Sequence, residues 1–261
     1  MTSKLKAITQ SISELSESQI TELYCLYKKY YTNNNRDTFY QDLSEKDHVF
    51  IMLDKQSGCI KGFSTVKTIS LVLASGKEIY GVYSGDTIID KNYWGQSALQ
   101  VQFIKYFLRF KASHPFSDVY WFLISKGYKT YLLMANNFTQ YYPRHDLATP
   151  EKMTVIIDTF ARKLFPDNWS QQDGLIQFSL KHDHLKNNIA PITEKLRKIE
   201  KIAYFERMNP SWHEGSELAC IARIDLSSPL RYICKALKKG CFKILKGNKN
   251  KFETTKRSEK K

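Results

Sequence analysis

The segment Tyr80–Gln100 constrains the fold of this chain more than any other, because a strand in it leads directly into a helix. It reads YGVYSGDTIIDKNYWGQSALQ: a β-favouring run that ends at Asp90, a turn with Tyr93, Trp94 and Gly95, and the start of an amphipathic helix. Such a turn presents free backbone N–H groups at the positive end of a helix dipole. A helix terminus of this kind is suited to bind a pyrophosphate. The segment therefore predicts a nucleotide or coenzyme site in a fold that contains strands and helices.

The surrounding pattern predicts an α/β fold of the α+β type, with a mixed and mostly antiparallel sheet flanked by helices. Turn-forming residues separate three β-favouring runs, which is typical of an antiparallel meander. These runs are Val49–Leu53, Ile60–Leu73 and Glu78–Ile89, and a further buried strand is expected at Val119–Ile124. Apolar residues at helical spacing, together with a Ser16–Gln19 capping box, predict helices at 17–31, 39–43, 96–111 and 137–142.

The second half of the chain predicts further helices and a closing hairpin. Helices are expected at 152–164 and 193–201, on either side of a loop-rich stretch at 166–190. The last two strands are expected at Ile202–Arg207 and Leu218–Ile224. We therefore expect one domain over 1–228, with a helical insertion at about 147–201, followed by a basic tail at 229–261.

Positive charge is concentrated in this tail. Residues 235–261 hold 11 Lys and Arg against two acids, a net charge of +9, so that only +5 of the formal +14 belongs to residues 1–234. A body that is only mildly basic argues against a nucleic-acid-binding protein. Apolar residues lie among lysines in 229–247, which favours contact of a basic amphipathic segment with an anionic membrane surface. Contact with nucleic acid and a solvated tail are the alternatives.

Cysteine usage and the lengths of the apolar runs predict a cytoplasmic protein, either free or at the periphery of a membrane. The five cysteines are scattered without CxxC spacing, which is typical of reduced thiols rather than of disulfides or a zinc site. No apolar run has the length of a membrane span or a secretory signal. His182 and His184 lack further ligands at metal-site spacing, so no metal is expected.

The turn sequence resembles that of the GNAT acyltransferase superfamily. DKNYWGQSAL, which starts at Asp90, is similar to the P-x-Y-R-G-x-G-I-G stretch of that family, aligned through Tyr93, Gly95 and Gln96. The resemblance implies that the pyrophosphate of coenzyme A binds to the backbone amides of Trp94, Gly95, Gln96, Ser97, Ala98 and Leu99. Ser97 and Leu99 stand where the family has glycine or alanine, and a Cβ there would crowd a closely approaching phosphate.

A second segment, Leu132–Asp146, supports the same resemblance. It reads LLMANNFTQYYPRHD and is similar to the asparagine-then-tyrosine segment that follows the fifth strand of the family. The resemblance implies that Asn136 lies close to the pantetheine arm and that Tyr142, six residues later, protonates the leaving thiolate. The preceding SKGYKTYLLM is similar to N-acyl amino acid and acyl-homoserine-lactone synthases, which use larger acyl or amino-acid substrates.

Four further residues are candidates for the chemistry. Gly85 could mark a β-bulge that separates two strands and admits pantetheine, or be a glycine that a twisted strand tolerates. Asp86 could act as general base or hold the acceptor amine, or point to solvent. His145 has the intrinsic pKa of a base, and a structural hydrogen-bonding role is the alternative. Arg144 could pair with a coenzyme phosphate or a substrate carboxylate, or remain solvated.

Together these features predict an N-acyltransferase that works by direct transfer within a ternary complex. The donor is expected to be acyl-CoA, with an acetyl or a longer chain, or an acyl carrier protein. The acceptor is expected to be a small amine or an amino acid. Two alternatives stay open. One is a catalytically silent acyl-CoA-binding module, because of Ser97 and Leu99; the other is an adaptor that acts on a membrane or nucleic acid through the basic tail.

Overall fold

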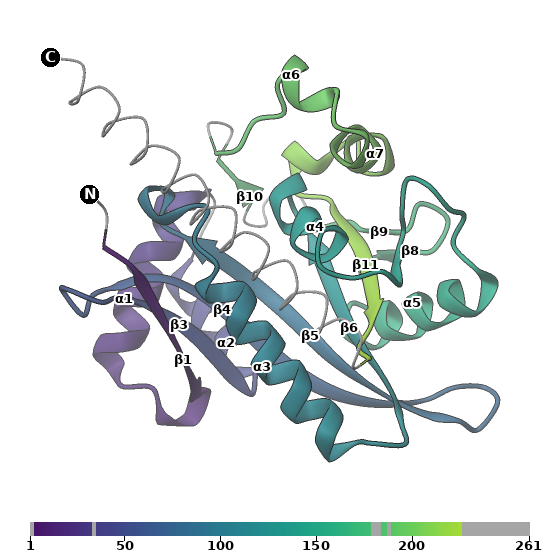
Figure 1. The fold of residues 1–261 in the computed structure, drawn as a ribbon, viewed down its shortest axis with the longest axis horizontal. Coiled ribbons are helices and arrows are strands. Elements are labelled where there is room, and N and C mark those ends of the chain that lie inside the picture. The colour runs from purple at the N-terminus through teal and green to yellow at the C-terminus, as the bar shows by residue number, and fades with distance from the viewer. Residues whose placement is uncertain (1–2, 33–34, 179–183, 187–188, 226–261) are drawn as a thin grey trace, which may run out of the picture. The chain divides into compact units, whose positions relative to one another are not determined.

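The computed structural model describes residues 3–32, 35–178, 184–186 and 189–225 (Figure 1). The predicted basic tail, with its predicted membrane contact at 229–247, lies outside the described residues. The chain up to Ile224 forms one compact unit. None of the helices in the described ranges is both long enough and apolar enough to cross a lipid bilayer.

A nine-stranded mixed sheet organises this unit (Figure 1). Its order is β1 (Leu5–Ser11), β3 (His48–Asp54), β4 (Ile60–Val72), β5 (Glu78–Ile89), β6 (Asp118–Ser125), β11 (Glu217–Arg223), β9 (Leu175–Ile176) and β8 (Trp169–Ser170), and β7 (Tyr141–Tyr142) also pairs with β11. Among the described pairs in this sheet, β5 and β6 run parallel and all others are antiparallel. A separate ribbon joins β2 (Tyr31–Thr32) to β10 (His184–Leu185).

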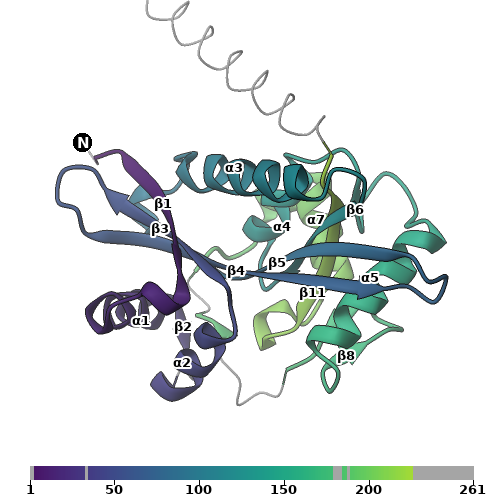
Figure 2. The ribbon, with the colours of Figure 1, turned by 90° about the horizontal axis from the view of Figure 1, so that it is seen from below.

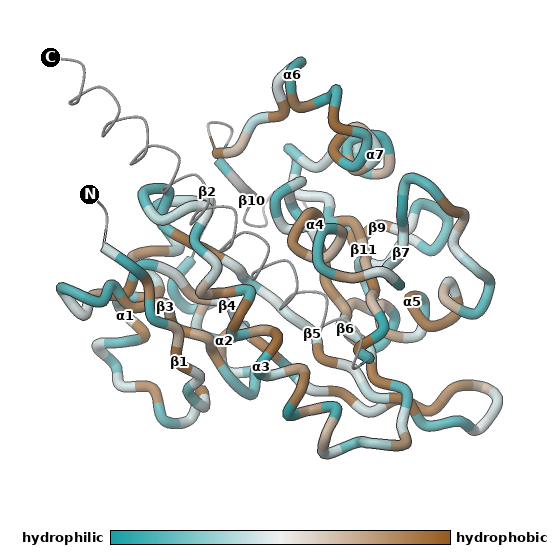
Figure 3. The backbone as a smooth tube through the Cα atoms, viewed as in Figure 1, coloured by the Kyte–Doolittle hydropathy of each residue, from teal (hydrophilic) through white to brown (hydrophobic). Residues whose placement is uncertain are grey.

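Helices cover both faces of the sheet (Figure 2). One face packs against α3 (Ala98–Ser113), α4 (Tyr128–Ala135) and α7 (Glu200–Met208), which α6 (Glu194–Arg197) precedes. The other face packs against α1 (Glu17–Tyr30), α2 (Arg36–Ser44) and α5 (Glu151–Leu164). Hydrophobic positions follow the central strands, as along β6 and β11 (Figure 3). Burial of apolar strand faces on both sides is what holds such layers together.

Local sequence explains where the first and third helices begin and how they pack. The Ser16 hydroxyl accepts a hydrogen bond from the Gln19 N–H at 3.2 Å, and the Gln19 side chain accepts one from the Ser16 N–H at 3.0 Å, so the predicted capping box is confirmed. In α3, Leu99, Phe103 and Phe107 recur every four residues and are all buried. This spacing places them on one helical face, which packs on the sheet.

The predicted fold class is confirmed: a mostly antiparallel sheet with helices on both faces. The three-stranded meander, the helix after it, the strand at 119–124 and the helix at 152–164 are present. Sequence analysis missed β1, where one buried residue, Leu5, is followed by exposed and half-buried positions without a clear alternation.

Two predictions on the chain after residue 136 are wrong. Residues 202–207, expected as a strand, belong to α7, where Ile202 and Phe205 are buried three positions apart on one helical face. Consequently, β11 pairs with β6 and does not close a hairpin with 202–207. Residues 137–142, expected as a helix, follow α4 and end in strand β7, so the helix of this region lies earlier, at Tyr128–Ala135.

Candidate functional site

The parallel strands β5 and β6 separate before either of them ends. Their pairing runs from Ile79 opposite Asp118 to Ser84 opposite Leu123, yet β5 continues to Ile89 and β6 to Ser125. The edge of β5 beyond Ser84 therefore has no strand partner on the β6 side among the described residues. Backbone N–H and C=O groups on such an edge are available to an extended ligand that carries amides.

A β-bulge sits at the point of separation. On the β4 side, Ser64 lies opposite Thr87 and Val66 opposite Ser84, so that Gly85 and Asp86 together face the single residue Thr65. Two residues opposite one is the definition of a bulge, and bulges bend the strand that carries them. The bulge predicted at Gly85 is therefore present, and it coincides with the end of the β5–β6 pairing.

A pocket of about 330 Å³ lies beside the unpaired end of β5. Its walls come from Thr87–Ile89 of β5, from the turn Tyr93–Gln96 with the first turn of α3, and from 126–133, which covers the start of α4. Tyr30 and Tyr31 at the end of α1, and Ile189 and Ala190 from the late part of the chain, complete it. Four of the six predicted pyrophosphate-binding positions line this pocket, namely Trp94, Gly95, Gln96 and Leu99; Ser97 and Ala98 do not.

The turn that enters α3 keeps its glycine where the backbone requires one. Gly95 has a φ of +86°, a left-handed conformation that residues with a Cβ rarely adopt. The first backbone hydrogen bond of α3 runs from the Val101 N–H to the Ser97 carbonyl at 3.0 Å, and the Ser97 side chain caps none of the earlier N–H groups. The start of α3 thus presents backbone donors at the positive end of a helix dipole.

Side chains of the turn fasten it to its neighbours. The Tyr93 hydroxyl donates to Asp54 Oδ2 at 2.8 Å. The N–H of Ser57 and then the Tyr93 hydroxyl hold the pKa of Asp54 well below its usual value, because both hydrogen bonds favour the charged carboxylate. Trp94 Nε1 donates to the Ile89 carbonyl at 2.8 Å.

Gln96 has a structural role that the sequence did not reveal. Its Oε1 accepts from the Leu5 N–H at 2.8 Å, and its Nε2 donates to the Ser3 carbonyl at 3.0 Å. The side chain therefore anchors the start of β1, and only the backbone of Gln96 remains for the predicted coenzyme contact.

Two lysines give the opposite wall of the pocket a positive charge. Lys126 and Lys129 flank Gly127, the residue from which α4 begins. The Lys129 ammonium lies 2.9 Å from the ring centroid of Trp94, and burial lowers the pKa of Lys129 to about 8. Lys126 Nζ lies 3.5 Å from Glu217 Oε1 and 5.0 Å from the ring centroid of Tyr31. Sequence analysis missed both lysines, although their position directly after a buried strand is visible in SKGYK.

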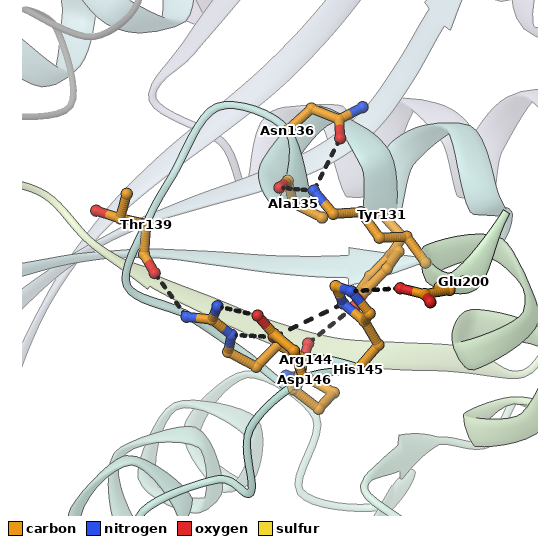
Figure 4. A network of polar contacts seen from close by, with 10 residues as sticks. Tyr131, Ala135, Asn136, Thr139, Arg144, His145, Asp146 and Glu200 are labelled. Atoms are coloured by element: carbon orange, nitrogen blue, oxygen red, sulfur yellow. Dashed lines mark hydrogen bonds and ion pairs between the residues drawn. The ribbon is translucent and has the colours of Figure 1, made fainter.

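The structure gathers Asn136, Arg144 and His145 in a network away from this pocket (Figure 4). Arg144 holds Asp146 with two hydrogen bonds of 2.5 Å and also donates to the Thr139 carbonyl. Asn136 Oδ1 accepts from Lys201 Nζ at 3.0 Å. These contacts tie the loop after α4 to itself and to α7.

His145 belongs to the same network rather than to the pocket (Figure 4). Its Nε2 lies 3.4 Å from the Glu200 carboxylate, and its Nδ1 lies 3.7 Å from Asp146 Oδ1 and makes no hydrogen bond. Arg144 is bound to Asp146 and Thr139, so it is not the solvated side chain that the sequence offered as its alternative.

Tyr142 also lies far from the bulge. It lies in β7, opposite Ile221 of β11. Ile221 in turn lies opposite Phe122 of β6, and Phe122 lies opposite Tyr83 of β5. Three strand spacings, roughly 14 Å, therefore separate its backbone from β5. The structure does not bring Tyr142 together with Asp86, and Tyr142 does not line the pocket.

Comparison with known proteins places solved acyltransferases among the similar folds. No protein-family model and no curated protein matches the sequence. A probable N-acyltransferase from Enterococcus faecalis V583 is matched at 11% identity and a TM-score of 0.37, over 48% of this chain and 31% of that one. Arabidopsis thaliana NAA60, solved with a bisubstrate analogue, is matched at 14% identity and a TM-score of 0.37, over 52% and 87%.

The GNAT-family N-acetyltransferase YhbS from Escherichia coli, solved with CoA, is matched at 11% identity and a TM-score of 0.33, over 48% of this chain and 66% of that one. The match thus spans less than a third of the Enterococcus protein and about half of this chain. These likenesses concern the fold of about half of this chain.

Proposed function

We propose that this chain is a GNAT-type N-acyltransferase that moves an acyl group from a coenzyme A thioester to an amine. The observation that carries the proposal is the bulge at Gly85–Asp86, which ends the β5–β6 pairing beside a pocket entered by the turn Tyr93–Gln96. An amide-bearing arm such as pantetheine can occupy the place that a paired strand would take along β5.

The phosphates of the donor would bind at the outer end of the pocket. Backbone N–H groups at the start of α3 supply donors, and the helix dipole favours negative charge there. The Lys129 ammonium, held over Trp94, adds a cation on the opposite wall. A coenzyme A thioester, with its pyrophosphate, and the single phosphate of a carrier-bound pantetheine both fit this chemistry. The carrier protein therefore remains the second donor to test.

The transfer step would take place at the bulge. The amine nitrogen forms a bond to the thioester carbonyl carbon, the C–S bond breaks, and the thiolate takes up a proton. A backbone N–H that the bulge leaves without a strand partner can stabilise the oxyanion, as preorganised donors do in acyl transfer. We assign the role of general base to Asp86, which lies at the bulge. Because Tyr142 lies three strands away, we assign the protonation of the thiolate to solvent or to Tyr31, which lines the pocket.

A thermal-shift titration tests the donor part of this proposal. Coenzyme A, acetyl-CoA and a long-chain acyl-CoA are added to the full chain, and a ligand at a hundredfold excess over its dissociation constant should stabilise the fold by about 2.7 kcal/mol. Lys129→Met should reduce the shift, whereas Lys163→Met, which removes an exposed lysine on α5, should leave it unchanged. A shift for all thioesters indicates a general acyl-CoA site, and one confined to long chains indicates synthesis of lipid amides.

Release of free thiol from acetyl-CoA in the presence of amines tests the transfer part. Thiol release that depends on an added amine supports the acyltransferase. Binding of coenzyme A without thiol release from any thioester would instead support the catalytically silent binding module. No thermal shift with any thioester or with an acyl carrier protein refutes both.

A further inference from the structure

The unpaired edge of β5 presents the backbone groups of Thr87 and Ile89. Ile89 lies opposite Gly62 of β4. The next residue, Asp90, donates its N–H to the Lys61 carbonyl at 2.8 Å. In an antiparallel ladder this bond flanks a pair that shares no hydrogen bonds of its own, so the N–H and C=O of Ile89 point away from β4. Thr87, two residues earlier, has the same orientation, and these are the groups that an extended amide-bearing arm would meet.

The side chain of Trp94 already occupies one of these groups. Its indole N–H donates to the Ile89 carbonyl at 2.8 Å, and both residues line the pocket. An indole N–H and an amide N–H are neutral donors of the same kind. Trp94 therefore makes the bond that an amide of the arm would make, and an arm that follows the edge as far as Ile89 has to displace the indole.

Lys129 continues this contact to the opposite wall of the pocket. It belongs to α4, and its ammonium lies 2.9 Å from the centroid of the Trp94 ring. Within the described part of the chain Lys129 has no carboxylate partner, whereas Lys126 contacts Glu217 Oε1 at 3.5 Å. Burial lowers the pKa of Lys129 to about 8, which agrees with the lack of such a partner. A phosphate is a stronger partner for this ammonium than a neutral ring is.

The Trp94 side chain is placed so that it can leave. It is 43% exposed and belongs to none of the hydrophobic clusters of the described core. Its polar and cation–π contacts with described residues are the bond to Ile89 and the contact with Lys129. Rotation of a half-exposed side chain about its own χ angles is fast and leaves the backbone in place. Exchange of these two contacts therefore does not require the core to open.

We propose that Trp94 and Lys129 form a latch across the pocket, which the acyl donor opens by replacing both contacts. An amide N–H of the donor arm takes the place of the indole at the Ile89 carbonyl, and a phosphate of the donor takes the place of the ring at Lys129. This inference rests on the proposed function and adds how its site is regulated. A donor that carries both an amide arm and a phosphate replaces both contacts, whereas a simple thioester without the arm replaces neither.

Calorimetric titration of the full chain with coenzyme A tests the latch. Trp94→Phe keeps a ring for Lys129 but removes the indole N–H, so the arm no longer has to displace it. The affinity for coenzyme A should rise about two- to tenfold, the usual range for one hydrogen bond between neutral groups. Trp169→Phe is the matched control, because its indole also donates a hydrogen bond of 2.8 Å, to Asp158 Oδ1, and it does not line the pocket. The control should leave the affinity unchanged.

Tryptophan fluorescence gives a readout that a merely structural role for Trp94 would not change. Among the tryptophans that the structure describes, Trp94 alone lines the pocket. Release of its indole N–H to water should shift the emission of the wild-type protein to longer wavelength when coenzyme A binds. Pantetheine, which carries the amides without a phosphate, should produce the same shift, and Trp94→Phe should abolish it.

The possible outcomes separate the latch from the proposed function. Equal or weaker binding of coenzyme A by Trp94→Phe, or binding to the wild-type protein without the wavelength shift, overturns the latch and leaves the proposed function standing. The wild-type shift needs no variant, so it decides the question even if Trp94→Phe does not fold. Binding of coenzyme A to Trp94→Phe alone supports both, because the latch then holds the wild-type pocket closed. Binding to neither protein overturns both.

Discussion

Replacement of Gly85 by alanine tests the close contact at the bulge. The added Cβ would stand 2.6 Å from Thr65 Oγ1, 0.8 Å closer than the 3.4 Å at which such contacts become ordinary. Thr65 is β-branched and buried in a strand, so its hydroxyl has little freedom to move away. Overpacking of this kind lowers the free energy of unfolding by about 1–3 kcal/mol. Alanine also restricts the unfolded chain more than glycine does, which raises the free energy of unfolding by about 0.4–1 kcal/mol. We expect Gly85→Ala to lower the free energy of unfolding by about 1–2 kcal/mol.

A double-mutant cycle in urea separates this contact from a general effect on the strand. Thr65→Ala removes the hydroxyl that the new methyl group meets, so Gly85→Ala should cost at least about 1 kcal/mol less in that background. In the wild-type background the melting temperature should fall by roughly 2–4 °C per kcal/mol, as is usual for a domain of this size. An equal cost of Gly85→Ala in both backgrounds, or no cost in either, would refute the close approach of Gly85 to Thr65.

Three further predictions concern packing, the pocket and the turn. Gly81→Ala directs a methyl group into the ring of the fully buried Phe160. Calorimetry should show that the free energy of unfolding falls by about 1–3 kcal/mol or more, and an unchanged free energy would contradict this contact. The pKa of Lys129, near 8, predicts that the affinity for coenzyme A falls as the pH rises from 7 to 9, because the ammonium loses its charge. Lys129→Met should flatten this pH profile of affinity, and an equally steep profile in the variant would contradict the prediction. The pKa of Asp54 is lowered, so its stabilisation is present above pH of about 4 and lost as pH falls below it. Tyr93→Phe should therefore destabilise the protein at pH 7, and in acid denaturation the difference from wild type should shrink below that pH.

The central part of the fold could be predicted because its patterns are local. Alternating runs separated by turn residues fix β3, β4 and β5, and the helical spacing from Leu99 to Phe107 fixes α3. Residues 202–207 show why the later part could not. Their apolar residues, Ile202 and Phe205, fit one helical face, but a run of six residues is too short to separate that reading from a strand.

The site could be predicted only in part because its residues meet through strand register. The turn and the bulge are sequence-local, and both were found. Lys126 follows β6 and Glu217 lies on β11, and the two residues meet because β11 pairs with β6. Tyr142 was assigned a role by its spacing from Asn136, and the same pairing of β11 places it on the far side of two strands. A sequence fixes spacing along the chain, whereas register decides which residues face one another.

The two departures from the family stretch bear on whether the pocket can still hold a phosphate. Ser97 does not line the pocket, and the Leu99 side chain is buried in the core beneath α3. Gly95 occupies the one turn position whose backbone is left-handed. Backbone N–H groups donate whatever side chain they carry, so these substitutions leave the phosphate donors in place. A loss of coenzyme A binding would therefore not follow from Ser97 or Leu99, and it would have to arise elsewhere along the pocket, such as at the Lys126–Leu133 wall.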